Sequence, residues 1–438
     1  PDLAFGGDLM RGEVHPPLYY YLIYLVRQVL DFEPVLRLVN IVIFAIAAVL
    51  SVRQIQNKTI ACIFVGISAS LYWFYFYSTE IRSYSAIYSL AMLFTAMSWA
   101  QVTAERVRAG ALVQIGIVAV ILSATHAFGA LLVASTSLAF GVRCLLKREF
   151  SGFAGWAAVG IAGVSPAVIW YVLNLDYLYI VESDANAVQR LVEGLEQFAR
   201  GAITKTFGAN LLLAFIFFFG IRKSIVNKQS EFIGIAALTF LIVCFLIQAF
   251  VPHIKERAFI VLVPAYTIVC AQILSELETR GGWQKTVQWA LPAVMLLSPI
   301  LFVGEQFKDR EQSGARALAL AGYTQCADTP LPIYIRQDIN PAFFEYSTQR
   351  VLEQVWGRAV VVPSLTIGDG EAMPDPDCGL LAVALYLPRG EREFHELARE
   401  EIARIASADL SYSEESVGEG RNGGRTRLYY LGEPEAAN

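Results

Sequence analysis

The sequence predicts an α-helical membrane protein with about ten spans, followed by a small soluble α/β domain. Of its 438 residues, 55% are hydrophobic and only 17% are charged, whereas soluble domains carry about 25% charged residues. Residues 305–438 hold 22 acidic and 13 basic side chains, which leaves 17 acidic and 21 basic ones for residues 1–304. We therefore divide the chain into a membrane domain, 1–304, and a soluble domain, 305–438. The net charge of −5 argues against nucleic-acid binding, because polyanion binders are usually basic.

The first residues lead into an interfacial helix. Pro16 and Pro17 precede a tyrosine-rich apolar run, and proline is tolerated in the first turn of a helix. Such a helix lies flat among lipid headgroups and holds His15 at the membrane surface, although a plain anchor explains the same pattern. Because no span precedes this helix, we expect a membrane helix upstream of Pro1.

Ten segments have about the length that a membrane helix needs. They lie near 34–52, 59–77, 84–103, 110–126, 128–146, 154–173, 206–221, 232–251, 258–276 and 286–304. Buried helices of a soluble protein are the alternative, but no soluble fold needs ten such runs in succession. Tyr72, Trp73, Tyr75 and Tyr77 place four rings at one end of a span, where an aromatic belt is expected.

Basic residues in alternate loops predict the orientation, since cytoplasmic loops are enriched in Lys and Arg. These residues are Arg53, Lys58, Arg106, Arg108, Arg143, Lys147, Arg148, Arg222, Lys223, Lys228, Arg280 and Lys285. The other loops, and the soluble domain, then face outward. We expect an integral protein of the plasma (inner) membrane whose active site and C-terminal domain are periplasmic or otherwise extracytoplasmic.

Ionisable residues gather on the predicted outer side. Glu80 and Arg82 lie at a membrane boundary, where charged groups are costly to bury and point to function. Tyr84 shares a helix face with Glu80, four residues away. A solvated helix end is the alternative for this group. His126 lies where two spans turn outside, and a lone histidine is more often structural than catalytic.

A second outer group is basic. His253, Lys255 and Arg257 stand between two spans, against the usual sorting of positive charge. Fixed cations at this position suit a ligand that bears phosphate. A chance basic loop is the alternative.

The long outer loop 174–205 contains an amphipathic pattern. At helical spacing the apolar residues fall on one face, and they are Val188, Leu191, Val192, Leu195 and Phe198. The polar set opposite is Gln189, Arg190, Glu193 and Glu196. Such a helix roofs a lateral cavity at the membrane surface, or it is only an interfacial loop.

The soluble domain combines strand-like and helical segments. Strands are predicted near 332–336, 359–362 and 380–387, a helix over 390–406, and a hairpin from 411–417 to 425–431. Cys326 and Cys378 are its two cysteines, and an oxidising outer compartment allows them to form a disulfide. The domain carries no nucleotide-binding or hydrolase motif, so we expect it to position substrate or to add stability.

The motifs, taken in order over about 15–275, resemble the GT-C superfamily of integral-membrane glycosyltransferases. They are His15-Pro16-Pro17-Leu18-Tyr19-Tyr20, Arg37-Leu38, Glu80-x-Arg82-x-Tyr84, Thr125-His126, and a basic loop into Arg257 and Pro264. The likeness is strongest to the bacterial family-39-like branch, which includes lipopolysaccharide-core and aminoarabinose transferases and is related to protein O-mannosyltransferases.

This resemblance implies transfer of a sugar from a polyprenyl-phosphate carrier to an extracytoplasmic lipid, glycan or protein. His15 and Glu80 would lie near the sugar phosphate, Arg82, Lys255 and Arg257 would bind the phosphate, and Tyr84 would line the pocket. A carboxylate would take the proton of the acceptor hydroxyl, and direct displacement would invert the anomeric centre. The metal requirement stays open, with a divalent ion as one possibility.

The family's acidic Asp-Glu pair, which sits in the first outer loop, has no counterpart in residues 1–14. We therefore expect the catalytic Asp upstream of Pro1 and take Asp8 as the fallback base. The principal rival function is a transporter or flippase of polyprenyl-linked sugars. Transporters often show inverted repeats and ionisable residues at mid-membrane depth, and neither is evident here. A structural assembly protein is the other rival.

Overall fold

A computed structural model describes residues 16–30, 33–78, 82–103, 108–174, 187–199, 228–250 and 256–278, a few positions between 286 and 293, and five strands between 333 and 431. The chain divides into two compact units, Pro1–Leu301 and Phe302–Asn438.

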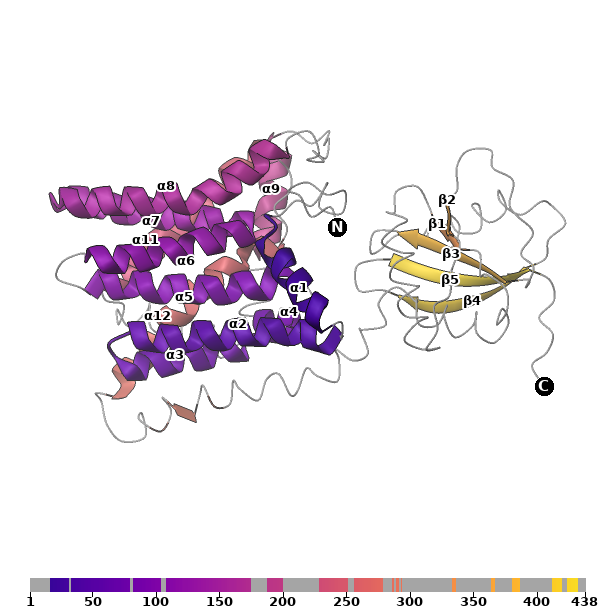
Figure 1. The fold of residues 1–438 in the computed structure, drawn as a ribbon, viewed down its shortest axis with the longest axis horizontal. Helices are drawn as coiled ribbons and strands as arrows, with labels where there is room; N and C mark the ends of the chain where they lie inside the picture. Colours follow the sequence, from indigo (N-terminus) through magenta and orange to yellow (C-terminus); the bar gives the residue numbers. More distant parts are fainter. Residues whose placement is uncertain are drawn as a thin grey trace. The chain divides into compact units, whose positions relative to one another are not determined.

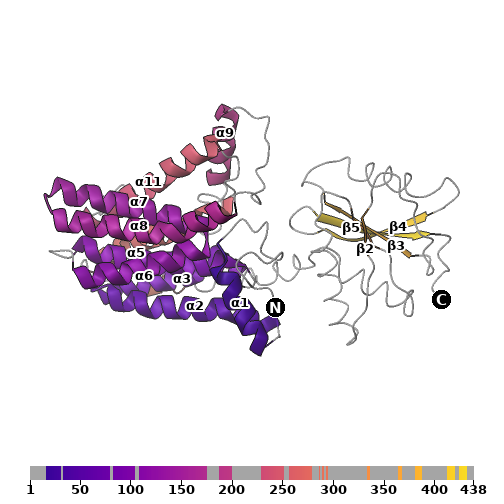
Figure 2. The same cartoon turned by 45° about the horizontal axis from the view of Figure 1, so that its top comes forward.

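The first unit is a bundle of helices (Figures 1 and 2). The described helices are α1 Leu18–Val29, α2 Glu33–Gln54, α3 Lys58–Ser70, α4 Tyr72–Ser78, α5 Ser83–Thr103, α6 Ala109–Thr125, α7 Ala127–Leu146, α8 Phe150–Leu173, α9 Ala187–Phe198, α11 Lys228–Phe250, the 3-10 helix η3 Glu256–Leu262 and α12 Val263–Glu278. Figure 1 shows α2, α3, α5, α6, α7 and α8 running side by side, with α1 oblique to them. Both views place α1 and α9 at the same end of the bundle.

Eight of the ten predicted segments coincide with described helices, while 206–221 and nearly all of 286–304 lie outside the described residues. Within the described part, four helices are long and apolar enough to cross a membrane: Val35–Gln54, Ala127–Leu146, Phe150–Leu173 and Arg257–Glu276. Apolar side chains also stay exposed on the outside of the bundle, for example Ile46, Ile117 and Ile161, at 55%, 56% and 76%. Exposed apolar surface on this scale is typical of a protein that faces lipid.

Helix α5 is the centre of the bundle. Its side chains are almost all buried, among them Tyr88, Met92 and Phe94, and it packs against α2, α6, α12 and η3. Serine, threonine and tyrosine interrupt its apolar sequence, and it is absent from the four described helices that are apolar enough to span a membrane. Its position is therefore fixed by neighbouring helices and not by contact with lipid.

The predicted segment 59–77 is not one helix, which corrects the sequence prediction. It breaks at Leu71, whose backbone is extended (φ −80°, ψ 146°), and α4 begins at the next residue. The Ser70 hydroxyl donates to the Ile67 carbonyl at 2.7 Å, a local bond that competes with helix continuation. Two of the four rings predicted to form a belt, Trp73 and Tyr77, are instead buried in the core.

Glycines let α8 approach α6 and α7 closely. A Cβ atom on Gly155 would stand 2.3 Å from Leu112 Cδ1, and one on Gly163 would stand 2.7 Å from Val133 Cγ1 and 2.8 Å from Ala119 Cβ. Small residues at such crossings are how membrane helices gain van der Waals contact.

Buried hydrogen bonds join α3, α5 and α12. The Tyr88 hydroxyl donates to the Ser68 carbonyl at 2.9 Å. The hydroxyls of Ser68 and Thr267 share a hydrogen bond of 3.3 Å. These bonds satisfy polar groups that would be costly to leave unpaired in an apolar interior.

Two of the basic residues used to predict orientation also cap helix ends. The Lys58 ammonium donates to the carbonyls of Val52 and Ile55 at 2.7 and 3.0 Å. The Arg143 guanidinium donates to the Val102 carbonyl at 3.3 Å. Cations at helix C-termini satisfy carbonyls and the helix dipole.

The second unit contains a five-stranded sheet in the order β2-β1-β3-β5-β4. The strands are β1 Ile333–Ile335, β2 Ser364–Thr366, β3 Leu380–Tyr386, β4 Tyr412–Glu419 and β5 Gly424–Leu431. Strand β1 pairs in parallel with β2 and β3, whereas β5 pairs antiparallel with β3 and β4. The strand predicted over 359–362, the helix over 390–406 and both cysteines lie outside the described residues.

Candidate functional site

The structure describes four of the nine predicted catalytic and substrate-binding residues, namely Arg82, Tyr84, His126 and Arg257. The other five, Asp8, His15, Glu80, His253 and Lys255, lie outside the described residues. Three of the four described residues form one continuous contact, although they come from separate parts of the sequence.

Tyr84 is the centre of this contact. It occupies the first turn of α5 and is 4% exposed. Its ring lies 4.9 Å from that of Tyr77 on α4, and the Tyr77 ring stacks on Trp73 at 5.9 Å. The buried aromatic residues of α4 thus hold the Tyr84 ring in place from one side, because rings at these separations attract each other beyond their area burial.

Arg257 approaches the same ring from η3. Its guanidinium carbon is 5.2 Å from the centroid of the Tyr84 ring, within the range of a cation–π interaction worth about 0.5–2 kcal/mol. The residue is partly buried, while the five residues after it in η3 are fully buried. None of the described carboxylates forms an ion pair with Arg257.

His126 completes the group at the junction of α6 and α7. It is 1% exposed, and its ring lies 5.4 Å from Tyr84 and 5.3 Å from Phe128. Its Nδ1 accepts a hydrogen bond of 3.2 Å from the Phe128 backbone amide, so the imidazole acts as the N-cap of α7. An accepting Nδ1 also fixes the neutral tautomer with its proton on Nε2.

Arg82 lies immediately before α5 and is partly buried. It forms no ion pair or hydrogen bond with the other described residues of the group. Arg82 is near Tyr84 because it precedes it by two residues in the chain. Its assignment to phosphate binding stays a prediction.

Sequence reasoning missed a buried polar pair beside this group. Asn40, on α2, is 0% exposed, and its amide reaches the carbonyl of Ser78, at the end of α4, at 3.5 Å. Tyr19 of α1 is also buried, which raises the pKa of its hydroxyl, while the nearby Asn40 side chain acts in the opposite direction. An asparagine within an apolar span was the available signal, because polar side chains at such positions are costly unless paired.

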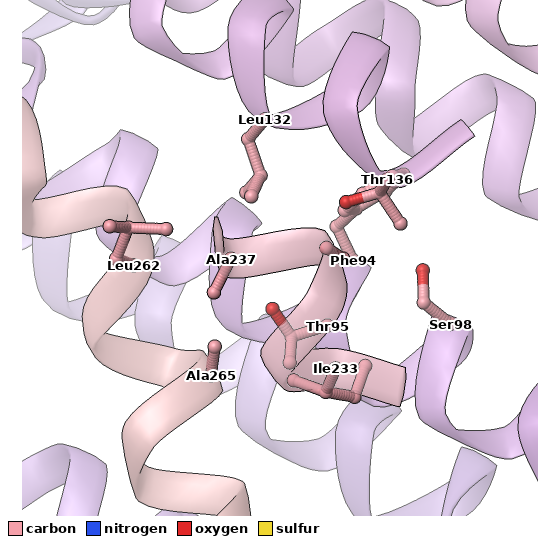
Figure 3. A pocket seen from close by; sticks show the side chains of 10 residues that line it. Phe94, Thr95, Ser98, Leu132, Thr136, Ile233, Ala237, Leu262 and Ala265 are labelled. Carbon is pink, nitrogen blue, oxygen red and sulfur yellow. The ribbon is translucent and has the colours of Figure 1, made fainter. Parts of the chain in front are cut away.

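The bundle also contains a small cavity between α5, α7, α11 and α12 (Figure 3). Its volume is about 20 Å³, and Phe94, Leu132, Ile233 and Leu262 contribute much of its lining. Thr95, Ser98 and Thr136 add hydroxyl groups, and the oxygens of Thr95 and Thr136 turn toward the space between the helices in Figure 3. A water needs about 10–15 Å³ and a ligand pocket some 300–1,000 Å³, so this cavity suits water and not a sugar.

Among the described residues, no group of three or more His, Cys, Asp or Glu side chains could hold a metal ion. Around Tyr84 the described residues place one cation, Arg257, and the aromatic rings of Tyr77 and His126.

Comparisons with known proteins bear on the fold. No protein-family model matches the sequence, and no curated protein matches it. Two solved structures of ArnT from Cupriavidus metallidurans are similar to it, each at 12% identity over 95% of this chain and 87% of the other. The one bound to undecaprenyl phosphate has a TM-score of 0.53, and the apo form has a TM-score of 0.50. At this identity the likeness shows a shared fold.

Proposed function

We propose that this chain is a glycosyltransferase that moves a sugar from a polyprenyl-phosphate donor to an extracytoplasmic acceptor. Two observations support this proposal. ArnT is a GT-C glycosyltransferase with a similar fold. In this chain, the Arg257 cation lies over the Tyr84 ring at one end of the bundle. The observation that carries the proposal is the Arg257–Tyr84–His126 contact.

The chemistry of the transfer needs a cation near the leaving group. The acceptor hydroxyl oxygen attacks the anomeric carbon, and the bond from that carbon to the phosphate oxygen breaks. The electron pair leaves with the polyprenyl phosphate, while a carboxylate takes the acceptor proton. Arg257 stabilises the charge that grows on the phosphate, and we assign Arg82, His253 and Lys255 to the same task.

The remaining roles follow the family resemblance. Glu80 or Asp8, or an Asp upstream of Pro1, acts as the base. His15 lies near the sugar phosphate, and direct displacement inverts the anomeric centre. We place the site on the periplasmic side of the inner membrane, with a lipid, glycan or protein as acceptor.

The test uses the full-length protein in proteoliposomes with a set of labelled undecaprenyl-phosphate sugars. Release of undecaprenyl phosphate together with a labelled acceptor supports transfer. Movement of the intact donor across the bilayer without release supports a flippase instead. Arg257→Ala should lower transfer by about a hundredfold with unchanged expression, and unchanged turnover would contradict the phosphate assignment.

A further inference from the structure

Helix α9 is amphipathic, as its sequence pattern predicts, but its apolar side chains do not share the same surroundings. Val188, Val192 and Leu195 are 69%, 59% and 54% exposed. Phe198 instead packs against the buried core of the bundle. At 3.6 residues per turn, Phe198 lies about 80° around the helix from the exposed stripe, so the two sets of side chains have different partners.

Phe198 contacts two other elements through its ring. The Phe198 ring lies 5.2 Å from that of Phe259 at an interplanar angle of 74°, and 6.1 Å from that of Phe245, on α11, at 80°. Both are edge-to-face arrangements, which aromatic pairs favour. Phe259 is fully buried in η3, so Phe198 joins α9 directly to that segment.

The same segment carries Arg257. A 3-10 helix has three residues per turn, so Arg257 and Phe259, two positions apart, project in different directions. One reaches the Tyr84 ring and the other reaches Phe198. The result is a chain of contacts that runs from α9 through η3 to Tyr84 and His126.

From these contacts we infer that Phe198 is a positioning residue, which holds η3 so that the Arg257 guanidinium stays at the phosphate subsite beside Tyr84. This inference rests on the proposed function, because it assigns Arg257 to the phosphate of the donor. The ring contacts of Phe198 are with Phe259 and Phe245, so we assign its effect on the ligand to the contact with η3.

The experiment is a double-mutant cycle on the full-length protein in nanodiscs, with undecaprenyl phosphate as the probe. Phe198→Ala should weaken binding of the probe by about tenfold, the upper range for an aromatic pair. In an Arg257→Ala background the same change should alter binding by less than about twofold, since the guanidinium that Phe198 positions is gone. A purely structural role would instead weaken binding equally in both backgrounds.

Val192→Ala is the matched control, because it truncates an apolar side chain on the exposed stripe of the same helix. It should leave binding unchanged. Phe198→Leu keeps much of the buried volume without the ring, so it should fold as the parent does even if Phe198→Ala does not, and it should still weaken binding measurably.

The outcomes separate the two proposals. Parent-like binding by Arg257→Ala would overturn the phosphate assignment and the inference with it. A strong defect in Arg257→Ala with parent-like binding by Phe198→Ala and Phe198→Leu would overturn the positioning role alone. Equal losses on both sides of the cycle would also overturn it.

Discussion

The guanidinium of Arg257 lies over the ring of Tyr84, with 5.2 Å between the guanidinium carbon and the ring centroid. The two residues lie in the first turns of different elements, η3 and α5, and meet at the end of the bundle where α1 and α9 also lie. A cation held over a ring keeps its N–H donors available to an anion, because the ring attracts the face of the guanidinium and accepts few of its N–H hydrogen bonds.

The ring of Tyr84 matters more than its hydroxyl for holding Arg257. Tyr84→Phe keeps the aromatic face, so donor binding should stay within about twofold of the parent value. Tyr84→Leu removes the face and should weaken binding by about fivefold to tenfold. Titration of each variant with undecaprenyl phosphate checks this, and an equal loss in Tyr84→Phe and Tyr84→Leu would show that the hydroxyl carries the interaction.

His126 has a capping role that is separable from its ring contacts. His126→Ala removes the N-cap of α7 and should lower the free energy of unfolding by about 1 kcal/mol. His126→Asn supplies another side-chain acceptor and should retain stability, but it lacks the ring that contacts Tyr84, so both variants should lose transfer activity. Denaturant unfolding and turnover are the measurements. Full activity in His126→Asn would show that His126 only caps α7 and that its ring contributes nothing to transfer.

The close approach of α8 to α6 and α7 leaves no space for a methyl group at Gly163. Gly163→Ala would bring a Cβ atom within 3 Å of Val133 and Ala119, and overpacking of this kind costs about 1–3 kcal/mol. Gly234→Ala is the control, since nothing lies within 4 Å of its added Cβ and alanine favours a helix by about 0.8–1 kcal/mol. Thermal unfolding of both variants in the same detergent checks this: Gly163→Ala on α8 should be destabilised and Gly234→Ala on α11 should not.

Cys326 and Cys378 should form a disulfide in the protein isolated from its native compartment. Peptide mapping by mass spectrometry without reductant should recover the linked pair. Cys326→Ser and Cys378→Ser should each lower the stability of the second unit by about 2–4 kcal/mol. Recovery of two free thiols would contradict both the bridge and the outward location that motivated it.

The sequence predicted the helices well and their contacts poorly. Apolar length alone placed α2, α6 and α7 to within two residues, because each presents lipid-facing side chains that hydropathy detects. The break at Leu71 was missed, since the extended backbone of this residue leaves no mark in the hydropathy of the segment. The burial of Trp73 and Tyr77 was missed for a related reason, because aromatic rings suit a membrane interface and a helix–helix core equally.

The candidate site was predicted in its residue types and only partly in its geometry. Tyr84, His126 and Arg257 were singled out from the sequence, and they do meet. The N-cap role of His126 needs the φ and ψ angles of one residue, which no periodic pattern encodes. Asn40 escaped notice, and Phe198 was predicted only as part of an apolar helix face, because the significance of both residues lies in partners from distant segments.

The burial of α5 has a consequence for the order in which the helices pack during synthesis. Its serine- and tyrosine-bearing surface gains little from acyl chains. The hydrogen bond from Tyr88 to Ser68 can form as soon as α3 and α5 are made, but the one between Ser68 and Thr267 needs α12, which is synthesised much later. Until then α5 packs only against the helices made before α12, chiefly α2, α4 and α6. A chain truncated before α12 would therefore form an incompletely packed bundle. Such a bundle is the kind of substrate that membrane quality-control proteases remove.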